Sequence, residues 1–230
     1  MERIRGIFVA IELCIALLIT NALMYIFQSK NYILRKNFTK LQAYFMGIRT
    51  KITGSPNLET QLYLLNHQSL LDIVAFEAFD NRDKCWVGKK EIEDIPLFGL
   101  IMSLPKMIAI DRKNKRSIIK IIKESRERIK EGRVITMFPE GTRGDGEKLL
   151  DFQVGAKILA EKLNLKVQPV VIVNTKNMLD SKKLLSRSGQ ISIIYLDAIN
   201  PKDDENWFET MQKDMQERLS HELANYTSHR

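Results

Sequence analysis

Apolar positions along the chain fall into runs of different length, and each length predicts a different kind of element. The longest run covers residues 7–27 and is interrupted by Glu12, Thr20 and Asn21. A helix needs about 20 apolar residues to cross a bilayer, so this run is long enough for a membrane segment. A cleaved signal peptide is the alternative, but the run is long for one and no small-x-small cleavage site stands clearly after it. We therefore expect an N-terminal membrane anchor.

Residues 32–48 repeat apolar side chains at helical spacing, with Arg35, Lys36 and Lys40 between them. This pattern predicts an amphipathic helix with a basic face, which suits a layer of lipid headgroups. A helix that packs on the core of the domain fits the same periodicity. A hairpin of both segments within one leaflet would return their basic flanks to the cytoplasmic side, and a helix that spans the bilayer remains the other arrangement.

From about residue 51 onward, short apolar runs alternate with helical patterns. The runs that predict strands cover residues 62–65, 84–87, 107–110, 134–138, 167–173 and 191–196. The helical patterns cover residues 70–79, 116–131, 154–163 and 205–226, and residues 181–189 read as a polar loop. The alternation predicts an α/β domain with a mixed, mainly parallel sheet flanked by helices. We expect residues 1–50 to form the membrane anchor and amphipathic helix, and residues 51–230 to form this domain.

The charge of the chain indicates an anionic partner. Its 230 residues carry 36 Lys and Arg against 28 Asp and Glu, a formal net charge of +8. A membrane surface, a phosphorylated small molecule and nucleic acid all fit this charge, but nucleic acid fits least because few aromatic residues stand on the basic stretches. Cys14 and Cys85 have no spaced Cys or His partner, so we expect neither a zinc site nor a disulfide framework.

The strand predicted at residues 62–65 runs into the most informative stretch of the chain. Asn66 and His67 follow this strand, and a helical pattern begins near Ser69. The spacing from His67 to Asp72 lets the carboxylate fold back onto one ring nitrogen, which leaves the other nitrogen free to take a proton. The alternative is structural, with Ser69 and Asp72 forming a capping box and His67 an ordinary polar residue at a strand end.

Charged residues follow two other predicted strands. Asp111 and Arg112 follow one, and residues 140–143 follow the next. Ligands of α/β sheets bind where such loops converge. Arginine matches phosphate through paired donors, so a base, a glycine turn and two arginines together predict an anionic substrate with a reacting hydroxyl.

Each of these residues also has an ordinary interpretation. Arg112 begins a basic run that suits a solvated surface, and Glu140 suits a turn acceptor. Arg143 stands close enough in sequence to Asp145 and Glu147 to form a local ion pair.

Four segments, taken in order, resemble the four motifs of the glycerolipid acyltransferase family. They are residues 66–72 (NHQSLLD), 89–112, 138–143 (FPEGTR) and 167–171. The residues that support these motifs beside the charged ones are Asn66, Gly99, Pro139 and Pro169. Pro169 also indicates an edge strand, a bulge or a strand start, because proline cannot donate to a sheet ladder.

The resemblance implies a role for each candidate. His67 would take the proton from a glycerol hydroxyl, and Asp72 would orient its ring. The residues that would hold the glycerol phosphate are Arg143, Glu140, Gly141, Thr142 and Arg112. The family usually has a small residue where this chain has Pro105 and Lys106, so Lys106 is an additional candidate cation.

The implied reaction transfers a fatty acyl group from an acyl carrier protein or coenzyme A thioester to the sn-2 hydroxyl of lysophosphatidic acid. The alkoxide would attack the thioester directly, so the resemblance implies no metal and no cofactor. The lipid substrate implies a bilayer partner. It also implies a place at the inner (plasma) membrane, with the catalytic domain on the cytoplasmic side.

Three other functions remain open. Another acceptor, such as glycerol 3-phosphate or a different lysolipid, fits the same motifs. A membrane-bound lipid hydrolase would need a nucleophile, but the chain has no Gly-x-Ser-x-Gly elbow. A non-catalytic membrane-binding module would have no use for both His67 and Asp72.

Overall fold

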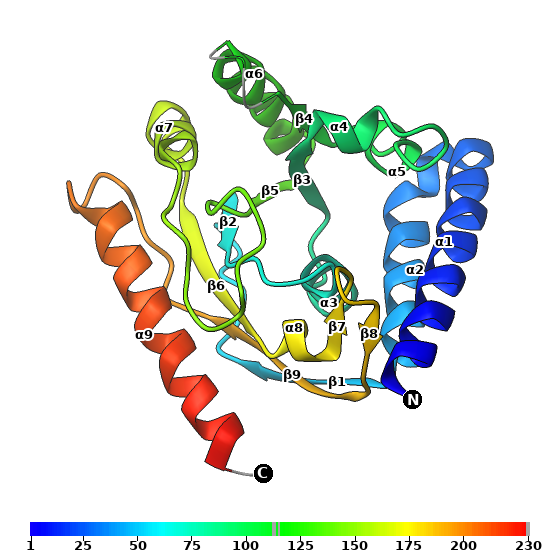
Figure 1. The fold of residues 1–230 in the computed structure, drawn as a ribbon. Coiled ribbons are helices and arrows are strands. Elements are labelled where there is room, and N and C mark those ends of the chain that lie inside the picture. Colours follow the sequence, from blue (N-terminus) through cyan, green and yellow to red (C-terminus); the bar gives the residue numbers. More distant parts are fainter. Residues whose placement is uncertain (112–113, 115, 229–230) are drawn as a thin grey trace.

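The computed structural model describes residues 1–111, 114 and 116–228. Within these ranges, a sheet of seven strands lies at the centre of the fold (Figure 1). Their order is β1 (Ile48–Thr53), β9 (Gly189–Tyr195), β6 (Val167–Val173), β2 (Leu62–Leu65), β5 (Val134–Met137), β3 (Lys84–Lys89) and β4 (Ile108–Ile110). The pairing of β6 with β9 is antiparallel and the other neighbours pair in parallel. The predicted mixed, mainly parallel sheet is confirmed.

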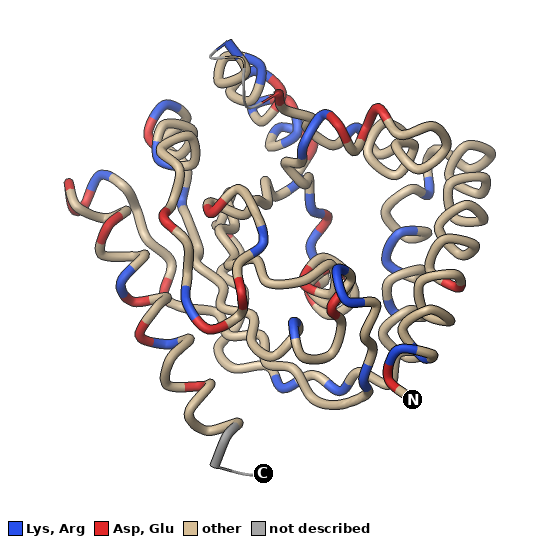
Figure 2. The backbone as a smooth tube through the Cα atoms, viewed as in Figure 1, with Lys and Arg blue, Asp and Glu red and all other residues tan. Residues whose placement is uncertain are grey.

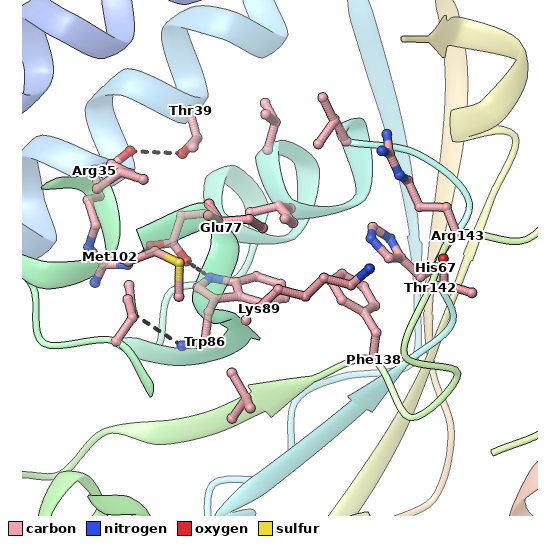
Figure 3. A pocket seen from close by; sticks show the side chains of 18 of the residues that line it. Arg35, Thr39, His67, Glu77, Trp86, Lys89, Met102, Phe138, Thr142 and Arg143 are labelled. Atoms are coloured by element: carbon pink, nitrogen blue, oxygen red, sulfur yellow. Dashed lines mark hydrogen bonds and ion pairs between the residues drawn. The ribbon is translucent and has the colours of Figure 1, made fainter. Parts of the chain in front are cut away.

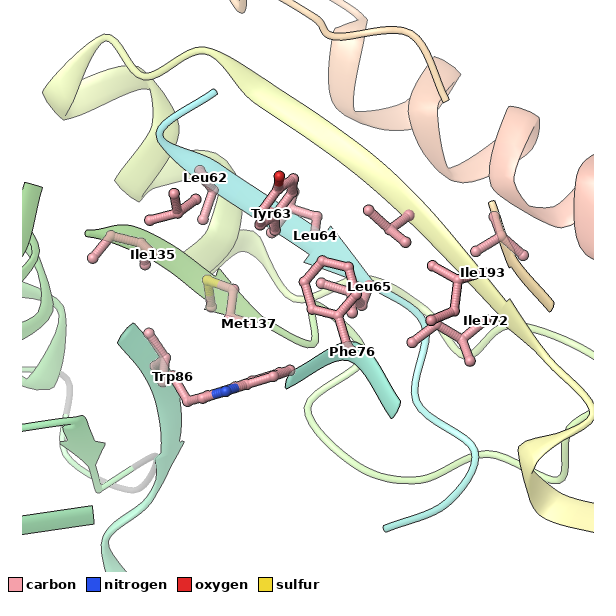
Figure 4. Packing of buried hydrophobic residues seen from close by; sticks show 14 of the residues in the cluster. Leu62, Tyr63, Leu64, Leu65, Phe76, Trp86, Ile135, Met137, Ile172 and Ile193 are labelled. Atoms are coloured by element: carbon pink, nitrogen blue, oxygen red, sulfur yellow. The ribbon is translucent and has the colours of Figure 1, made fainter. Parts of the chain in front are cut away.

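The central strands are buried along their whole length. Every residue of β2, β5 and β6 is buried, which is the condition of a parallel strand with both faces covered. Figure 4 shows the side chains of β2 between those of β5 and β6, with Phe76 and Trp86 packed beside them. These continuous apolar runs explain why the strands at 62–65 and 167–173 could be predicted at their observed bounds.

Helices cover the sheet on both sides. Helix α3 (Leu71–Phe79) is buried over seven of its nine residues and packs on α2. Helix α9 (Trp207–Ser228), predicted at residues 205–226, lies along β6 on the other side in Figure 1. Helices α6 (Ser117–Lys130) and α7 (Val154–Leu163) pack on each other near β4 and β5.

The N-terminal segments form a helical hairpin beside the sheet (Figure 1). Helix α1 (Glu2–Ile26) passes through the short helix η1 (Gln28–Lys30) into α2 (Asn31–Phe45). Both predicted helices are confirmed, although α1 begins at Glu2, before the apolar run. By length and composition alone, α1 could cross a membrane. Figure 2 shows its charges confined to the first turn and one later position, which is Glu12.

Helix α2 packs on the body of the domain. Its residue Arg35, expected on a face toward lipid headgroups, is 4% exposed and paired with Glu77 and Asp83. That expectation is wrong for Arg35, because the carboxylates of the domain lie on the side of α2 that α3 covers. The alternative of a core-packing helix is confirmed, while Ile33, Tyr44 and other apolar side chains of α2 remain exposed.

The structure differs from the sequence predictions in two strand regions. The strand β1 was not predicted, because it lies at an edge of the sheet and has only two apolar residues, Ile48 and Ile52, among charged and polar ones. The segment 181–189, predicted as a polar loop, contains β8 (Leu185–Ser186), which pairs with β7 (Leu179–Asp180). Because β1 straddles the predicted boundary at residue 50 and pairs with β9, the division into 1–50 and 51–230 stays a prediction.

Pro169 is the third residue of β6, which lies between β9 and β2. The edge-strand alternative is therefore wrong. The carbonyl of Pro169 accepts the N–H of Leu196 at 3.0 Å, so its nitrogen faces β9 where the antiparallel ladder begins at Val170. The missing N–H falls at the start of that ladder, where the loss is smallest.

Candidate active site

The ends of several parallel strands meet at one edge of the sheet. His67 follows β2, residues 138–143 follow β5, Lys89 ends β3, and Thr175 follows β6. Because β2, β5, β3 and β6 point the same way, these side chains gather at a common edge. Such an edge is where α/β domains bind their ligands.

His67 and Asp72 form the pair that their spacing predicted. The His67 Nδ1 lies 2.8 Å from the Asp72 Oδ2, and their side chains are 13% and 0% exposed. The same Oδ2 accepts the backbone N–H of Gln68 at 2.7 Å and of Ser69 at 2.8 Å. A carboxylate oxygen facing three donors requires the hydrogen on Nδ1, which leaves the lone pair of Nε2 free.

The structural alternative for these residues is present in part. The bond from the Ser69 N–H to Asp72 is the backward half of a capping box. The Ser69 hydroxyl, however, donates to the Leu179 carbonyl at 2.6 Å and accepts the Leu71 N–H at 3.2 Å. Asp72 thus fixes the turn and the imidazole at the same time.

The backbone and the ring of His67 are held from the loop after β5. The His67 N–H donates to the Glu140 Oε1 at 2.6 Å, and the His67 carbonyl accepts the Gly144 N–H at 2.8 Å. Its ring stacks on Phe138 with centroids 3.8 Å apart and planes 10° apart. Trp86 continues the stack at 5.4 Å from Phe138. The imidazole therefore has a defined position and plane.

Glu140 is buried, and both of its oxygens face the backbone. Its Oε2 accepts the Leu150 N–H at 2.7 Å, while Oε1 takes the His67 N–H. Burial raises the pKa of Glu140 to about 7, against the lowering effect of these two N–H donors. Glu140 does not line the cavity described below, whereas Gly141, Thr142 and Arg143 do.

The residues that support the motifs have clear structural partners. The side-chain amide of Asn66 pairs with the backbone of Ile172 through both ends, at 2.9 and 2.7 Å. A Cβ at Gly99 would lie 1.8 Å from the Glu93 carbonyl oxygen, so only glycine fits there. Pro139 accepts the Gln153 N–H at 2.8 Å.

A cavity of about 330 Å³ adjoins the His67 ring. In Figure 3, His67, Thr142 and Arg143 lie at one end, and Arg35 and Glu77 lie at the other. The walls between them are mainly apolar and come from α3, β3 and α5 (Leu100–Ser103), including Ile73, Val74, Trp86, Val87, Ile101 and Met102. An elongated apolar cavity that starts at a base suits an alkyl chain with its reacting group at the base.

A buried group of charges closes the far end of this cavity. Arg35 forms ion pairs with Glu77 and with Asp83, the latter at 2.6 Å. Glu77 also accepts the Trp86 Nε1–H at 3.3 Å and lies 3.7 Å from the Lys84 Nζ. Each charge in the group therefore has an opposite charge beside it, which offsets part of the cost of its burial.

The cations predicted for phosphate have different positions. Arg143 lines the cavity, and its Nη1 donates to the Ser181 hydroxyl at 2.7 Å. Asp145, an alternative partner, instead accepts the N–H groups of Glu147 and Lys148. Lys106 is exposed and lies outside the cavity lining, whereas Lys89 belongs to it. Arg112 lies outside the described residues.

Three residues in or near the site were given no role from the sequence. Lys89 had a usable signal, because it ends a strand whose neighbours carry the motifs, and Phe138 directly precedes Pro139. Thr175, which donates a hydrogen bond to Asp72, had none. Across the described parts of the chain, no group of three His, Cys, Asp or Glu is placed to hold a metal ion.

An oriented imidazole at one end of an apolar cavity, with Arg143 and Lys89 in the cavity lining, fits an enzyme that acts on a molecule with an alkyl chain. The family model described as Acyltransferase matches residues 49–173, more than half of the chain. The chain belongs to this family, and it is an acyltransferase.

Named relatives agree with this assignment. The chain is 37% identical to a 1-acyl-sn-glycerol-3-phosphate acyltransferase of Helicobacter pylori, over 96% of this chain and 94% of that protein. It is 32% identical to an enzyme of the same name from Cocos nucifera, over 71% of this chain and 54% of the relative. The crystal structure of the 1-acyl-sn-glycerophosphate (LPA) acyltransferase PlsC from Thermotoga maritima has the same fold. Its TM-score is 0.73 at 21% identity, with 97% and 99% of the two chains covered.

Proposed function

We propose that this enzyme transfers a fatty acyl group from a thioester to the sn-2 hydroxyl of lysophosphatidic acid and so forms phosphatidic acid. The names of its relatives support this acceptor. The single observation that carries the proposal is the contact of His67 with Asp72 at the mouth of an apolar cavity. A lipid alcohol and an acyl thioester can meet there.

The chemistry follows from the free Nε2 of His67. It takes the proton of the glycerol hydroxyl as the oxygen attacks the thioester carbonyl. Asp72 and the face of Phe138 stabilise the imidazolium that forms. When the tetrahedral intermediate collapses, the C–S bond breaks and the departing thiolate takes the proton from His67. The ester and the free thiol are the products, and these steps use no metal or cofactor.

The end of the cavity that carries Arg143 and Lys89 is the proposed phosphate site. Arg143, Thr142 and the backbone of Gly141 face the cavity from one side, and Lys89 faces it from β3. Glu140 acts as a brace instead of a phosphate ligand, because both of its oxygens accept backbone N–H groups and a carboxylate would repel the phosphate. Arg112 stays a candidate from the family resemblance, and Lys106 stays one as a departure from the family pattern. Because Lys89 lines the cavity and Lys106 does not, Lys89 is the stronger candidate of these two lysines.

The cavity is the proposed site of the acyl chain. Its apolar walls favour an alkyl chain over water. The buried pair of Arg35 and Glu77 closes the far end, so it limits the length of chain that fits. An acyl carrier protein or a coenzyme A thioester is the proposed donor, and the net charge of +8 suits the acidic or phosphorylated carrier of either one.

The helical hairpin is the proposed membrane contact. Large apolar side chains of α1 are exposed, among them Ile4, Ile7, Phe8, Ile11, Ile15 and Ile19. Both ends of α1 are fixed to the domain, because Arg5 donates to the Met46 carbonyl at 2.8 Å and Asn21 to the Leu97 carbonyl at 2.8 Å. We infer that α1 lies in one leaflet, on the cytoplasmic side of the inner membrane, so that the site faces its lipid acceptor.

A product assay tests the proposed function. Purified enzyme would receive lysophosphatidic acid with acyl carrier protein or coenzyme A thioesters, and parallel reactions would contain glycerol 3-phosphate, another lysolipid or no acceptor. We expect phosphatidic acid only with lysophosphatidic acid. Faster acylation of another acceptor would overturn the proposed substrate. Free fatty acid without an acceptor would indicate a hydrolase instead.

Thiol labelling tests the position of α1. In a Cys14→Ser background, Arg3→Cys and Ser29→Cys place thiols at exposed positions near the two ends of the helix. In sealed vesicles, an impermeant maleimide should label both from the same side. Labelling from opposite sides would show that α1 spans the bilayer.

A further inference from the structure

The carboxylate of Asp72 has two oxygens, and the family motif accounts for the partners of only one. The Oδ2 serves His67 and two backbone N–H groups of the same turn. The Oδ1 accepts a hydrogen bond from the hydroxyl of Thr175, which is 0% exposed and 103 residues further along the chain. This contact joins the catalytic turn to a different part of the fold.

Thr175 is held where it can make this bond. It is the first residue of α8 (Thr175–Met178) and follows Asn174, whose φ of +72° turns the chain sharply at the end of β6. The Asn174 side chain donates to the Gln190 carbonyl at 2.7 Å, which fixes this turn to β9. The Thr175 hydroxyl therefore meets Asp72 from a rigid element.

The same segment of chain holds the catalytic turn at two further points. Asn66 pairs with the backbone of Ile172, three residues before Thr175. The Ser69 hydroxyl donates to the Leu179 carbonyl, four residues after it. The turn that carries His67 is thus aligned along residues 172–179, and Thr175 is the member of this set that contacts the carboxylate itself.

We propose that Thr175 is a positioning residue for the His67–Asp72 base. The inference rests on the proposed function, in which Asp72 orients the imidazole and stabilises its protonated form. A buried carboxylate oxygen without a donor is costly, so the carboxylate would rotate to find another partner. Rotation would take Oδ2 away from the Nδ1–H of His67 and would release the ring from its catalytic tautomer.

Substitutions of Thr175 separate the effect of its hydroxyl group from the effect of its side-chain shape. Thr175→Val keeps the branched shape without the donor, and Thr175→Ser keeps the donor. Thr136→Val is a matched control, because Thr136 is also 0% exposed but its hydroxyl donates to the Val134 carbonyl. Thr175→Ala is the second variant if valine prevents folding, and thermal unfolding confirms that each protein is folded.

¹⁵N NMR of the histidines reports the tautomer of the His67 imidazole in the absence of substrate. Selective ¹⁵N-histidine labelling gives only three imidazoles, those of His67, His221 and His229. We expect His67 to show the Nδ1–H tautomer in the unaltered protein, in Thr175→Ser and in Thr136→Val, and to lose it in Thr175→Val. A folded Thr175→Val or Thr175→Ala protein with an unchanged His67 spectrum would overturn the inference, whatever the enzyme acylates.

Kinetics give the second readout. A hydrogen bond to a charged group corresponds to a change in rate of about 10-fold or more, so Thr175→Val should lower kcat by about 10-fold. The KM for both substrates should stay near its original value, because Thr175 does not line the cavity. Thr175→Ser should restore kcat. An inactive unaltered enzyme would count against the proposed function alone, whereas a fully active Thr175→Val would count against Thr175 alone.

Discussion

Helix α3 carries an acidic side chain toward each end, and the two carboxylates have different kinds of partner. At the first turn, Asp72 takes its hydrogen bonds from backbone N–H groups, a hydroxyl and His67. Toward the last turn, Glu77 contacts the cations of Arg35 and Lys84. A helix N-terminus stabilises negative charge and a C-terminus does not, so only the second carboxylate needs permanent cations.

This difference in partners suits Asp72 to the proposed catalytic role and Glu77 to a structural one. Asp72 has no permanent cation among its described contacts, so in the proposed mechanism its charge is available to the imidazolium of His67. Glu77 already has cationic partners, so it joins α2 to α3 through Arg35 and lines the far end of the cavity. Changes at Asp72 should therefore alter the rate, and changes at Glu77 should alter stability.

The largest effect should come from Asp72→Asn. The amide cannot stabilise an imidazolium and favours the wrong tautomer of His67, so kcat should fall by about 10²- to 10⁴-fold. Initial rates of phosphatidic acid formation check this, with circular dichroism as a control for folding. A variant that keeps the full rate would show that Asp72 is only a capping residue.

Glu77→Ala should act on stability instead. Removal of one partner from a buried ion pair costs about 3–5 kcal/mol of unfolding free energy when the remaining charge has no other partner. Arg35 keeps Asp83 and Lys84 keeps Asp80, so we expect a loss toward the lower end of that range. Chemical denaturation measures the loss, and kcat per folded molecule with a short acyl donor should change little. A large fall in kcat without a loss of stability would reverse the assignment of the two ends of α3.

Two lysines, Lys89 and Lys106, test which cation contacts the phosphate of the substrate. Lys89 lines the cavity and Lys106 does not. Loss of a charge-assisted contact to phosphate corresponds to about a 10-fold change in binding, so Lys89→Ala should raise the KM for lysophosphatidic acid by about that factor. Lys106→Ala is the matched control and should leave this KM nearly unchanged. The opposite ranking would restore Lys106 as the phosphate contact.

The smallest expected effect is a pH dependence of stability. Burial raises the pKa of Glu140 from 4.5 to about 7, so the folded protein holds this proton more tightly than the unfolded chain. The resulting stability is fully present below about pH 4.5 and is lost as the pH rises through about 7. Glu140→Gln should flatten this part of the stability curve in thermal unfolding. Parallel curves for the two proteins would contradict the assignment.

Long apolar runs made much of the fold predictable. The strands β2 and β6 and the helix α7 have their predicted bounds, because their burial leaves a continuous or periodic pattern. The strand β1 was not predicted because an edge strand with two apolar residues among charged and polar ones gives little hydrophobic signal. The burial of Arg35 could not be read from its own helix, since it depends on carboxylates 42 and 48 residues away.

The site was predictable only where its residues are close in sequence. The contact of His67 with Asp72 follows from five residues of spacing, and the geometry confirms it. The contacts of Glu140 with His67 and of Thr175 with Asp72 span 73 and 103 residues. Such contacts depend on which strands become neighbours, so the sequence indicated neither the brace at Glu140 nor any role for Thr175.

The rate of His67→Ala tests the central claim most directly. The claim is that the Nε2 of His67 takes the proton from the lipid hydroxyl. In a mixed-micelle assay with lysophosphatidic acid and an acyl thioester, the variant should form phosphatidic acid about 10²- to 10⁴-fold more slowly than the unaltered enzyme, with the same thermal unfolding midpoint. A folded His67→Ala protein that turns over at the original rate would contradict the account.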